Sequence, residues 1–279
     1  MNELEFNGRK LDLSRPAVMG ILNLTPDSFY DGGFYADLDS RVAQAGRMLD
    51  EGAAIIDIGG VSTRPGSGEI QEEEEMLRVM PALQAILRAY PECLVSIDTY
   101  RSRIAQLAVD NGAFMINDIF GGTGDPEMIP FIASCNVPYV MMHIRGKPLN
   151  MQEKPVYGDV VAEISYFFDA QLKKLQDLNF RKTILDPGFG FGKTVEHNFE
   201  ILRRLGEFFS HGYPLMAGLS RKSMINKVLG TNPSEAKNGT TVLNTIALLK
   251  GVSILRVHDV REAVEAVRLV EKLREGEIS

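Results

Sequence analysis

The chain has 279 residues, and its 37 Asp and Glu outnumber its 30 Lys and Arg. This acidic balance and the lack of a basic stripe argue against nucleic acid as a partner. Apolar residues make up 44% of the chain, which excludes disordered and fibrous classes, and no apolar run reaches the roughly 18 residues of a membrane span.

The first expected element is a β-hairpin. Leu4 to Leu11 alternate in polarity around Asn7-Gly8, a dipeptide favoured in two-residue turns. This start has no signal-peptide core, and neither Cys93 nor Cys135 lies in a CxxC pair. We therefore expect a cytoplasmic protein with no membrane contact.

Eight short apolar runs follow, of the kind expected for strands that are buried on both faces. In chain order they are Ala17–Leu22, Ala54–Ile58, Leu94–Ile97, Phe114–Ile116, Pro138–Met142, Thr183–Leu185, Pro214–Leu219 and Ser253–Val257. Helical patterns separate them, with apolar faces running from Leu38 to Leu49 and from Met76 to Leu87. The acidic run Glu72–Glu75 is expected to be a solvated first helical turn.

This alternation predicts an α/β fold, a (β/α)8 TIM barrel whose N-terminal mouth is plugged by the hairpin. Segments 50–57 and 110–117 repeat one pattern, in which a helix end and a Gly precede an apolar strand that ends in a polar residue. Residues 234–250 predict one extra helix before the last strand. No linker interrupts the pattern, so we expect a single domain over residues 1–279.

Polar side chains follow every predicted strand, and in a barrel these strand ends meet at the catalytic face. They are Asn23, Asp57, Asp98, Asn117, His143, Asp186, Ser220-Arg221-Lys222 and Arg256-Val257-His258. Any one of them could simply cap a strand, but the full set predicts a convergent polar site. Three acids beside Lys and Arg suit a ligand with several N–H donors, such as an aminopyrimidine.

Two glycine-rich loops add to this face, Thr25–Gly33 and Gly59–Gly68. In the second, Ser62, Thr63 and Arg64 offer hydroxyl groups and a guanidinium suited to phosphate. A third segment, Gly188–Thr194, resembles a nucleotide phosphate loop. Its spacing fails, because Pro187 stands where that motif requires Gly.

These segments together resemble the dihydropteroate synthases, the pterin-binding enzymes of the folate pathway. The resemblance is carried by Met19–Phe29, Asp31–Gly33, Asp57–Gly60, Ser62–Gly66, Ser96–Thr99, Ile116–Asp118, Met142-His143, Arg145-Gly146, Asp186–Gly188, Ser220–Ser223 and Arg256–Val260. One departure is Val61, where most members carry Glu, so no role of that Glu is transferred.

The resemblance implies that 6-hydroxymethyl-7,8-dihydropterin diphosphate reacts with 4-aminobenzoate by an SN1-like, Mg²⁺-assisted loss of diphosphate. Asp98, Lys222 and Arg64 would be catalytic. The implied binding groups are Asp98, Asn117, Asp186 and Lys222 for pterin, Asn23, Arg64, Arg256 and His258 for diphosphate, Asn23 for Mg²⁺, and Thr63, Pro65, Phe191 and Ser220 for aminobenzoate.

Two alternatives remain open. A methyltetrahydrofolate–corrinoid methyltransferase uses a similar barrel and pterin pocket, but it needs neither the Arg64 anion loop nor a metal at Asn23. A non-catalytic pterin-binding paralogue would not need every charged site position. The family also implies a homodimer through its last helices. The apolar surface of the final helix, at Val264, Val267, Leu269 and Val270, is interpreted mainly as barrel packing.

Overall fold

The computed structural model describes residues 2–24, 33–61, 68, 70–151, 153 and 155–275, with residues 33–37 described as backbone only. Eight parallel strands form one sheet. They are β3 (Ala17–Asn23), β4 (Ile55–Gly59), β5 (Leu94–Asp98), β6 (Met115–Asp118), β7 (Tyr139–Met142), β8 (Thr183–Asp186), β9 (Met216–Ala217) and β10 (Ile254–Val257).

The sheet curls into a nearly closed barrel. The strand order is β8-β7-β6-β5-β4-β3-β10-β9, and its two outer strands meet through a single bridge between Leu185 and Leu215. The TIM-barrel prediction is therefore confirmed. Strand β9 covers only part of the predicted run Pro214–Leu219. It forms a ladder with β10 on one side, and on the other side this run has only the bridge to Leu185.

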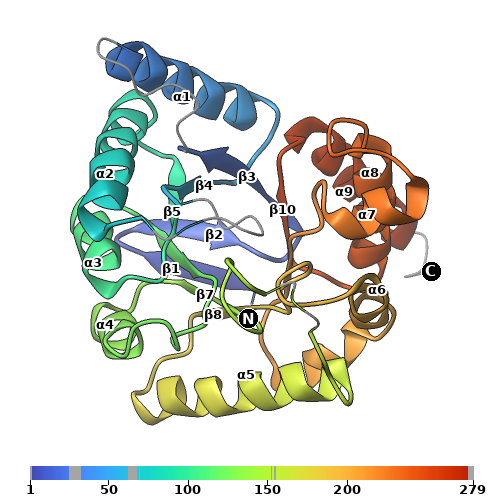
Figure 1. The fold of residues 1–279 in the computed structure, drawn as a ribbon. Coiled ribbons are helices and arrows are strands. Elements are labelled where there is room, and N and C mark those ends of the chain that lie inside the picture. Colours follow the sequence, from blue (N-terminus) through green and yellow to red (C-terminus); the bar gives the residue numbers. More distant parts are fainter. Residues whose placement is uncertain are drawn as a thin grey trace.

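Helices cover the outside of the barrel (Figure 1). They are α1 (Gly33–Asp50), α2 (Glu72–Ala89), α3 (Ser102–Asp110), α4 (Met128–Cys135), α5 (Val160–Asp177), α6 (Val195–Arg203), the 3-10 helix η1 (Leu205–His211), α7 (Ser223–Leu229), α8 (Lys237–Leu249) and α9 (Val260–Glu275). Both α7 and α8 lie between β9 and β10, which confirms the extra helix before the last strand. Within the described residues, no helix is long and apolar enough to cross a membrane.

The hairpin of β1 (Glu3–Phe6) and β2 (Arg9–Asp12) lies at the N-terminal ends of the barrel strands. The Arg9 guanidinium donates to the carbonyls of Cys93 and Gly112, at 3.2 and 2.6 Å, just before β5 and β6. Lys182, just before β8, donates to the Glu5 carbonyl. The hairpin thus plugs the N-terminal mouth, as predicted.

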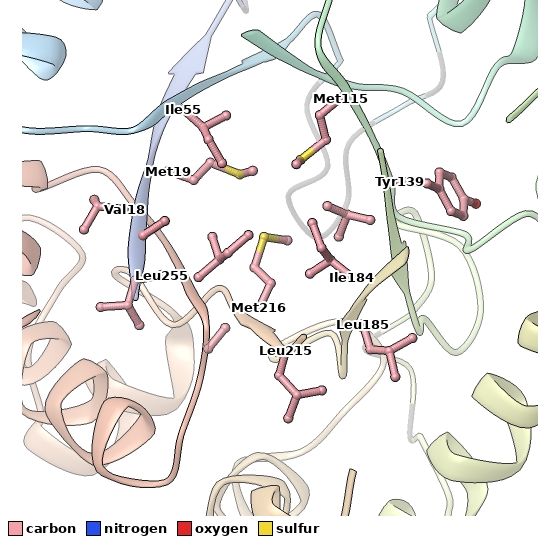
Figure 2. Packing of buried hydrophobic residues seen from close by; sticks show 14 of the residues in the cluster. Val18, Met19, Ile55, Met115, Tyr139, Ile184, Leu185, Leu215, Met216 and Leu255 are labelled. Atoms are coloured by element: carbon pink, nitrogen blue, oxygen red, sulfur yellow. The ribbon is translucent and has the colours of Figure 1, made fainter. Parts of the chain in front are cut away.

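The interior of the barrel is apolar near this plug. Figure 2 shows Met19, Ile55, Met115, Ile184 and Met216 pointing into the space that the strands enclose. Because strand side chains alternate between two faces, the residue two positions after each of these also points inward. At β4, β6 and β8 these positions approach the C-terminal mouth and carry the polar side chains Asp57, Asn117 and Asp186.

The acidic run at the start of α2 departs from the prediction. Glu75 is fully buried and pairs with Arg101, so the interpretation of Glu72–Glu75 as a solvated turn is wrong at this residue. The expected apolar face of α2 does pack on the core, with Leu83 buried and Met80 and Leu87 partly buried. The buried residues of α2 are Glu75, Val79, Ala82, Leu83 and Ile86.

Replacing Arg101 with methionine should destabilise the fold by about 3 kcal/mol at pH 7, because it leaves a buried carboxylate without its cation. Burial already raises the pKa of Glu75, and Arg101 opposes that rise. Without Arg101 the folded-state pKa rises further above the unfolded value, so the penalty should grow as the pH rises and be smaller at pH 5.

Urea unfolding of the variant at pH 5 and pH 7.5 measures this effect. The matched control is Arg103→Met, since Arg103 pairs with Glu72 on the exposed side of the same helix. That variant should lose less than about 1 kcal/mol. An equal loss in both variants would mean that the buried pair has no special energetic role.

Candidate functional site

A small cavity opens at the C-terminal ends of the strands. Its lining mixes acids, cations, an amide and large apolar side chains. The lining residues are Asp98, Asn117, Ile119, Met142, Asp186, Phe189, Phe191, Gly218, Lys222 and Arg256. The cavity therefore joins β5, β6, β7, β8 and β10 with the segments that follow β8 and β9.

Strand periodicity accounts for its polar groups. Asn117 and Asp186 each stand two residues after an inward apolar residue, Met115 and Ile184. β6 and β8 thus each contribute an apolar side chain to the barrel core and then a polar one to the cavity. The site is a direct continuation of the core packing.

Arg256 ties two of the acids together. Its Nε donates to Asp57 Oδ2 at 2.6 Å, and its Nη2 donates to Asp98 Oδ2 at 2.8 Å. Asn117 Nδ2 donates to the same Asp57 oxygen at 3.0 Å. Burial raises the pKa of Asp98 to about 7, although Arg256 opposes that rise. Asp57 and Asn117 are the corresponding residues of the internal repeat, and they meet inside the barrel.

A second group of residues lies across β8 and the segment after it. Asp186 is buried, and its Oδ1 accepts from the Gly188 amide at 2.7 Å. The Lys222 ammonium lies 4.1 Å from the centre of the Phe191 ring, a favourable cation–π contact. Burial lowers the pKa of Lys222 to about 8 and raises that of Asp186. A flat ring with donors on one edge suits a carboxylate beside an aromatic wall.

The structure brings together most of the predicted site residues that it describes. Asp98, Asn117, Asp186, Lys222, Phe191 and Arg256 all line the cavity. Ser220 and His258 form a pair, with Ser220 Oγ 3.0 Å from His258 Nδ1. Asn23 ends β3.

Three predicted site residues, Thr63, Arg64 and Pro65, lie outside the described residues, as does most of the loop Thr25–Gly33. The strand-end residue His143 points away from the cavity that Asp98, Asn117 and Asp186 line. It is buried, and its Nδ1 contacts Lys193 at 3.1 Å.

Sequence reasoning missed several residues of the site. The sequence predicts Asp57 as an acid at a strand end. Which residues it contacts depends on the register of the strands, which the sequence does not show. Ile119, Met142 and Phe189 form apolar walls, and nothing in their local pattern distinguishes them from core residues. Lys193 lies in the glycine-rich segment Gly188–Thr194. Because the spacing of that segment does not fit a phosphate loop, the sequence did not predict a role for this lysine.

One place could hold a cation. A Cβ added to Gly59 would lie 3.7 Å from Asn23 Oδ1 and 3.8 Å from Asp98 Oδ2, so these two oxygens converge beside the Gly59 backbone. Among the described residues, no cluster of three His, Cys, Asp or Glu side chains forms a complete metal site.

A family model described as pterin binding enzyme matches residues 19–258. The dihydropteroate synthase of Escherichia coli is 45% identical over 271 residues, covering 96% of this chain and 95% of that protein.

Two solved structures are also similar. A Yersinia pestis dihydropteroate synthase with a sulfonamide drug complex has a TM-score of 0.91 and 42% identity, with 98% of this chain and 99% of that one covered. A Xanthomonas albilineans dihydropteroate synthase with 4-aminobenzoic acid has a TM-score of 0.90 and 36% identity, with 98% of each chain covered.

Proposed function

Since this chain belongs to the dihydropteroate synthases of the pterin-binding enzyme family, the enzymes of folate biosynthesis, we propose how its site carries out their reaction. The substrates are 6-hydroxymethyl-7,8-dihydropterin diphosphate and 4-aminobenzoate, and the products are 7,8-dihydropteroate and diphosphate. The observation that carries the proposal is the convergence of Asp98, Asn117, Asp186 and Lys222 on one cavity.

In this proposal the pterin ring occupies that cavity. The Asp186 carboxylate accepts from the 2-amino and N3–H groups of the ring, and the Lys222 ammonium donates to a ring acceptor. Asn117 is held by its bond to Asp57, so its carbonyl oxygen has a fixed direction. When the ring leaves water, the N–H groups on its donor edge would have no hydrogen-bond acceptor if Asp186 were absent.

The reaction begins at the exocyclic carbon. The C–O bond breaks, both its electrons leave with diphosphate, and positive charge develops on the pterin. Asp98 stabilises that charge, and Arg256 keeps the Asp98 carboxylate in place. The aminobenzoate nitrogen then attacks the carbon and loses a proton to solvent. Diphosphate contacts are assigned to Arg64, Arg256 and His258.

Mg²⁺ would neutralise charge on the departing diphosphate. Asn23 is the protein ligand assigned to it, and the convergence of Asn23 Oδ1 and Asp98 Oδ2 beside Gly59 supports this role. Mg²⁺ commonly takes one or two protein oxygens and completes its coordination with water and substrate phosphate.

The aminobenzoate pocket is assigned to Thr63, Pro65, Phe191 and Ser220. Phe191 and Ser220 are both buried. The similar Xanthomonas albilineans enzyme with 4-aminobenzoic acid supports this substrate, and the Yersinia pestis complex supports a sulfonamide-sensitive site.

We further propose a cytoplasmic homodimer. Both cysteines are unpaired, which suits a reducing compartment.

The dimer surface is assigned to the last helices. Val267 and Val270 of α9 are buried against the barrel, as expected, but Leu269 is 73% exposed. Helices α7, α8 and α9 lie together on one side of the molecule (Figure 1). Their exposed apolar side chains are Val228, Leu229, Val242, Leu249, Leu269 and Leu273.

Substituting Asn23 tests the metal and leaving-group assignment. In Asn23→Ala, half-maximal product formation should need about tenfold more Mg²⁺, because the only assigned protein ligand is lost. Affinity for a diphosphate-free pterin should not change. Product and diphosphate release are followed across a Mg²⁺ titration, with Asn111→Ala at the far end of the barrel as control. An unchanged Mg²⁺ requirement would remove Asn23 from the metal site.

A further inference from the structure

Lys193 is a buried lysine behind the wall of the cavity. Its side chain is 2% exposed, and it does not line the cavity. The ammonium contacts three acceptors, namely His143 Nδ1 at 3.1 Å, the His143 carbonyl at 3.2 Å and the Phe191 carbonyl at 2.9 Å. Burial lowers the pKa of His143 to about 2, so all three acceptors are uncharged.

The segment that carries Lys193 is pressed against the end of β7. Gly188 and Gly192 have positive φ, and a Cβ on either would lie within 2.2 Å of the carbonyl oxygen of His143 or Arg145. Lys193 ties the same segment to His143 from within. Phe191, whose ring faces the cavity, is therefore fixed by its own carbonyl bond to Lys193.

The Lys193 charge also lies close to Asp186. Gly188 donates its amide to Asp186, and Lys193 Nζ is 3.3 Å from the position of a Cβ on Gly188. Burial raises the pKa of Asp186, and the Gly188 amide, Lys222, Arg256 and Lys193 each lower it. Of the two lysines, only Lys222 faces the cavity.

We propose that Lys193 is a positioning residue for pterin recognition, which fixes Phe191 and keeps Asp186 ionised from behind the cavity wall. This inference rests on the proposed role of Asp186. When a ligand enters, water leaves Asp186 and Lys222 turns to the ligand's acceptors. Lys193 stays in place, because it is buried and is held by His143 and the Phe191 carbonyl.

The pH dependence of pterin affinity tests the proposal. Asp186 faces Lys222, Arg256 and Lys193, while Lys193 faces His143, Arg145, Lys222 and Asp186. Burial lowers the pKa of Lys193 to about 7. Its charge is therefore present below neutral pH and lost above it.

In Lys193→Met the pKa of Asp186 should rise, so Asp186 should protonate at a higher pH. The dissociation constant of a diphosphate-free pterin should increase about tenfold at pH 6. The gap from the wild type should narrow at pH 8.5, where Lys193 has lost its charge in the wild type as well. A purely structural defect would weaken binding equally at the two pH values.

Calorimetric titration at pH 6 and pH 8.5 measures this difference. Lys193→Gln is the second variant, because it keeps donors for the two carbonyls but carries no charge, and it should show the same pH dependence. The control is Lys182→Met, which also loses bonds to backbone carbonyls, but at the opposite mouth. A pH-independent gap in both Lys193 variants, or no gap, overturns the proposal. Failure of the wild type to bind pterin would instead contradict the proposal that this cavity is a pterin site.

Discussion

Replacing Asp186 with alanine should weaken the binding of a diphosphate-free pterin by roughly 2–4 kcal/mol. The carboxylate is buried at the end of β8 and is the group assigned to the donor edge of the ring. Without it, at least two ligand N–H groups would enter the cavity without acceptors. The loss should affect binding as well as turnover, because these contacts form before any bond breaks.

Isothermal titration calorimetry gives this difference directly. Asp169→Ala is the matched control, because Asp169 lies exposed on the outer helix α5 and contacts His211. Its affinity for pterin should equal that of the wild type. A dissociation constant that is unchanged in Asp186→Ala would remove Asp186 from the pterin site.

The second large effect is expected at Arg256. In Arg256→Met, Asp57 and Asp98 lose the cation that joins them, at a cost of about 3–5 kcal/mol to the free energy of unfolding. The pKa of Asp98 is raised to about 7 by burial even with Arg256 present, and it should rise further without it. A folded-state pKa above the unfolded value costs stability as the pH rises, so the loss should be larger at pH 8 than at pH 5.

Urea unfolding at these two pH values tests the expectation. The double variant Asp57→Asn/Arg256→Met removes one of the two orphaned charges and should recover part of the stability at pH 8. Arg204→Met is the control, because its ion pairs with Asp159 and Glu207 lie at the surface. A loss that is independent of pH, or an absence of recovery in the double variant, would contradict the assigned charge network.

Much of the site could be predicted from the sequence because barrel strands place successive residues on alternating faces. In a short apolar run that ends in a polar residue, such as Met115-Ile116-Asn117, the apolar residues belong to the core and the polar residue lies at the cavity. The internal repeat even marked Asp57 and Asn117 as equivalent. Their hydrogen bond depended on the register of β4, β5 and β6, which no local pattern supplies.

The errors and omissions arose where a charged side chain is buried by tertiary packing. Glu75 lies in an acidic run that looks solvated, and only the approach of Arg101 from the segment before α3 explains its burial. Lys193 follows a glycine-rich loop, where a lysine ordinarily reaches a ligand. Its burial depends on how closely Gly188 approaches His143, which the sequence does not encode locally.

The central claim, that this cavity holds the pterin ring, is tested most directly by locating a diphosphate-free pterin bound to the crystallised chain. The account predicts the ring in the cavity, with its 2-amino group within hydrogen-bond distance of the Asp186 carboxylate and an acceptor within reach of Lys222. A ring bound elsewhere, or bound here with its donor edge turned away from Asp186, would contradict it.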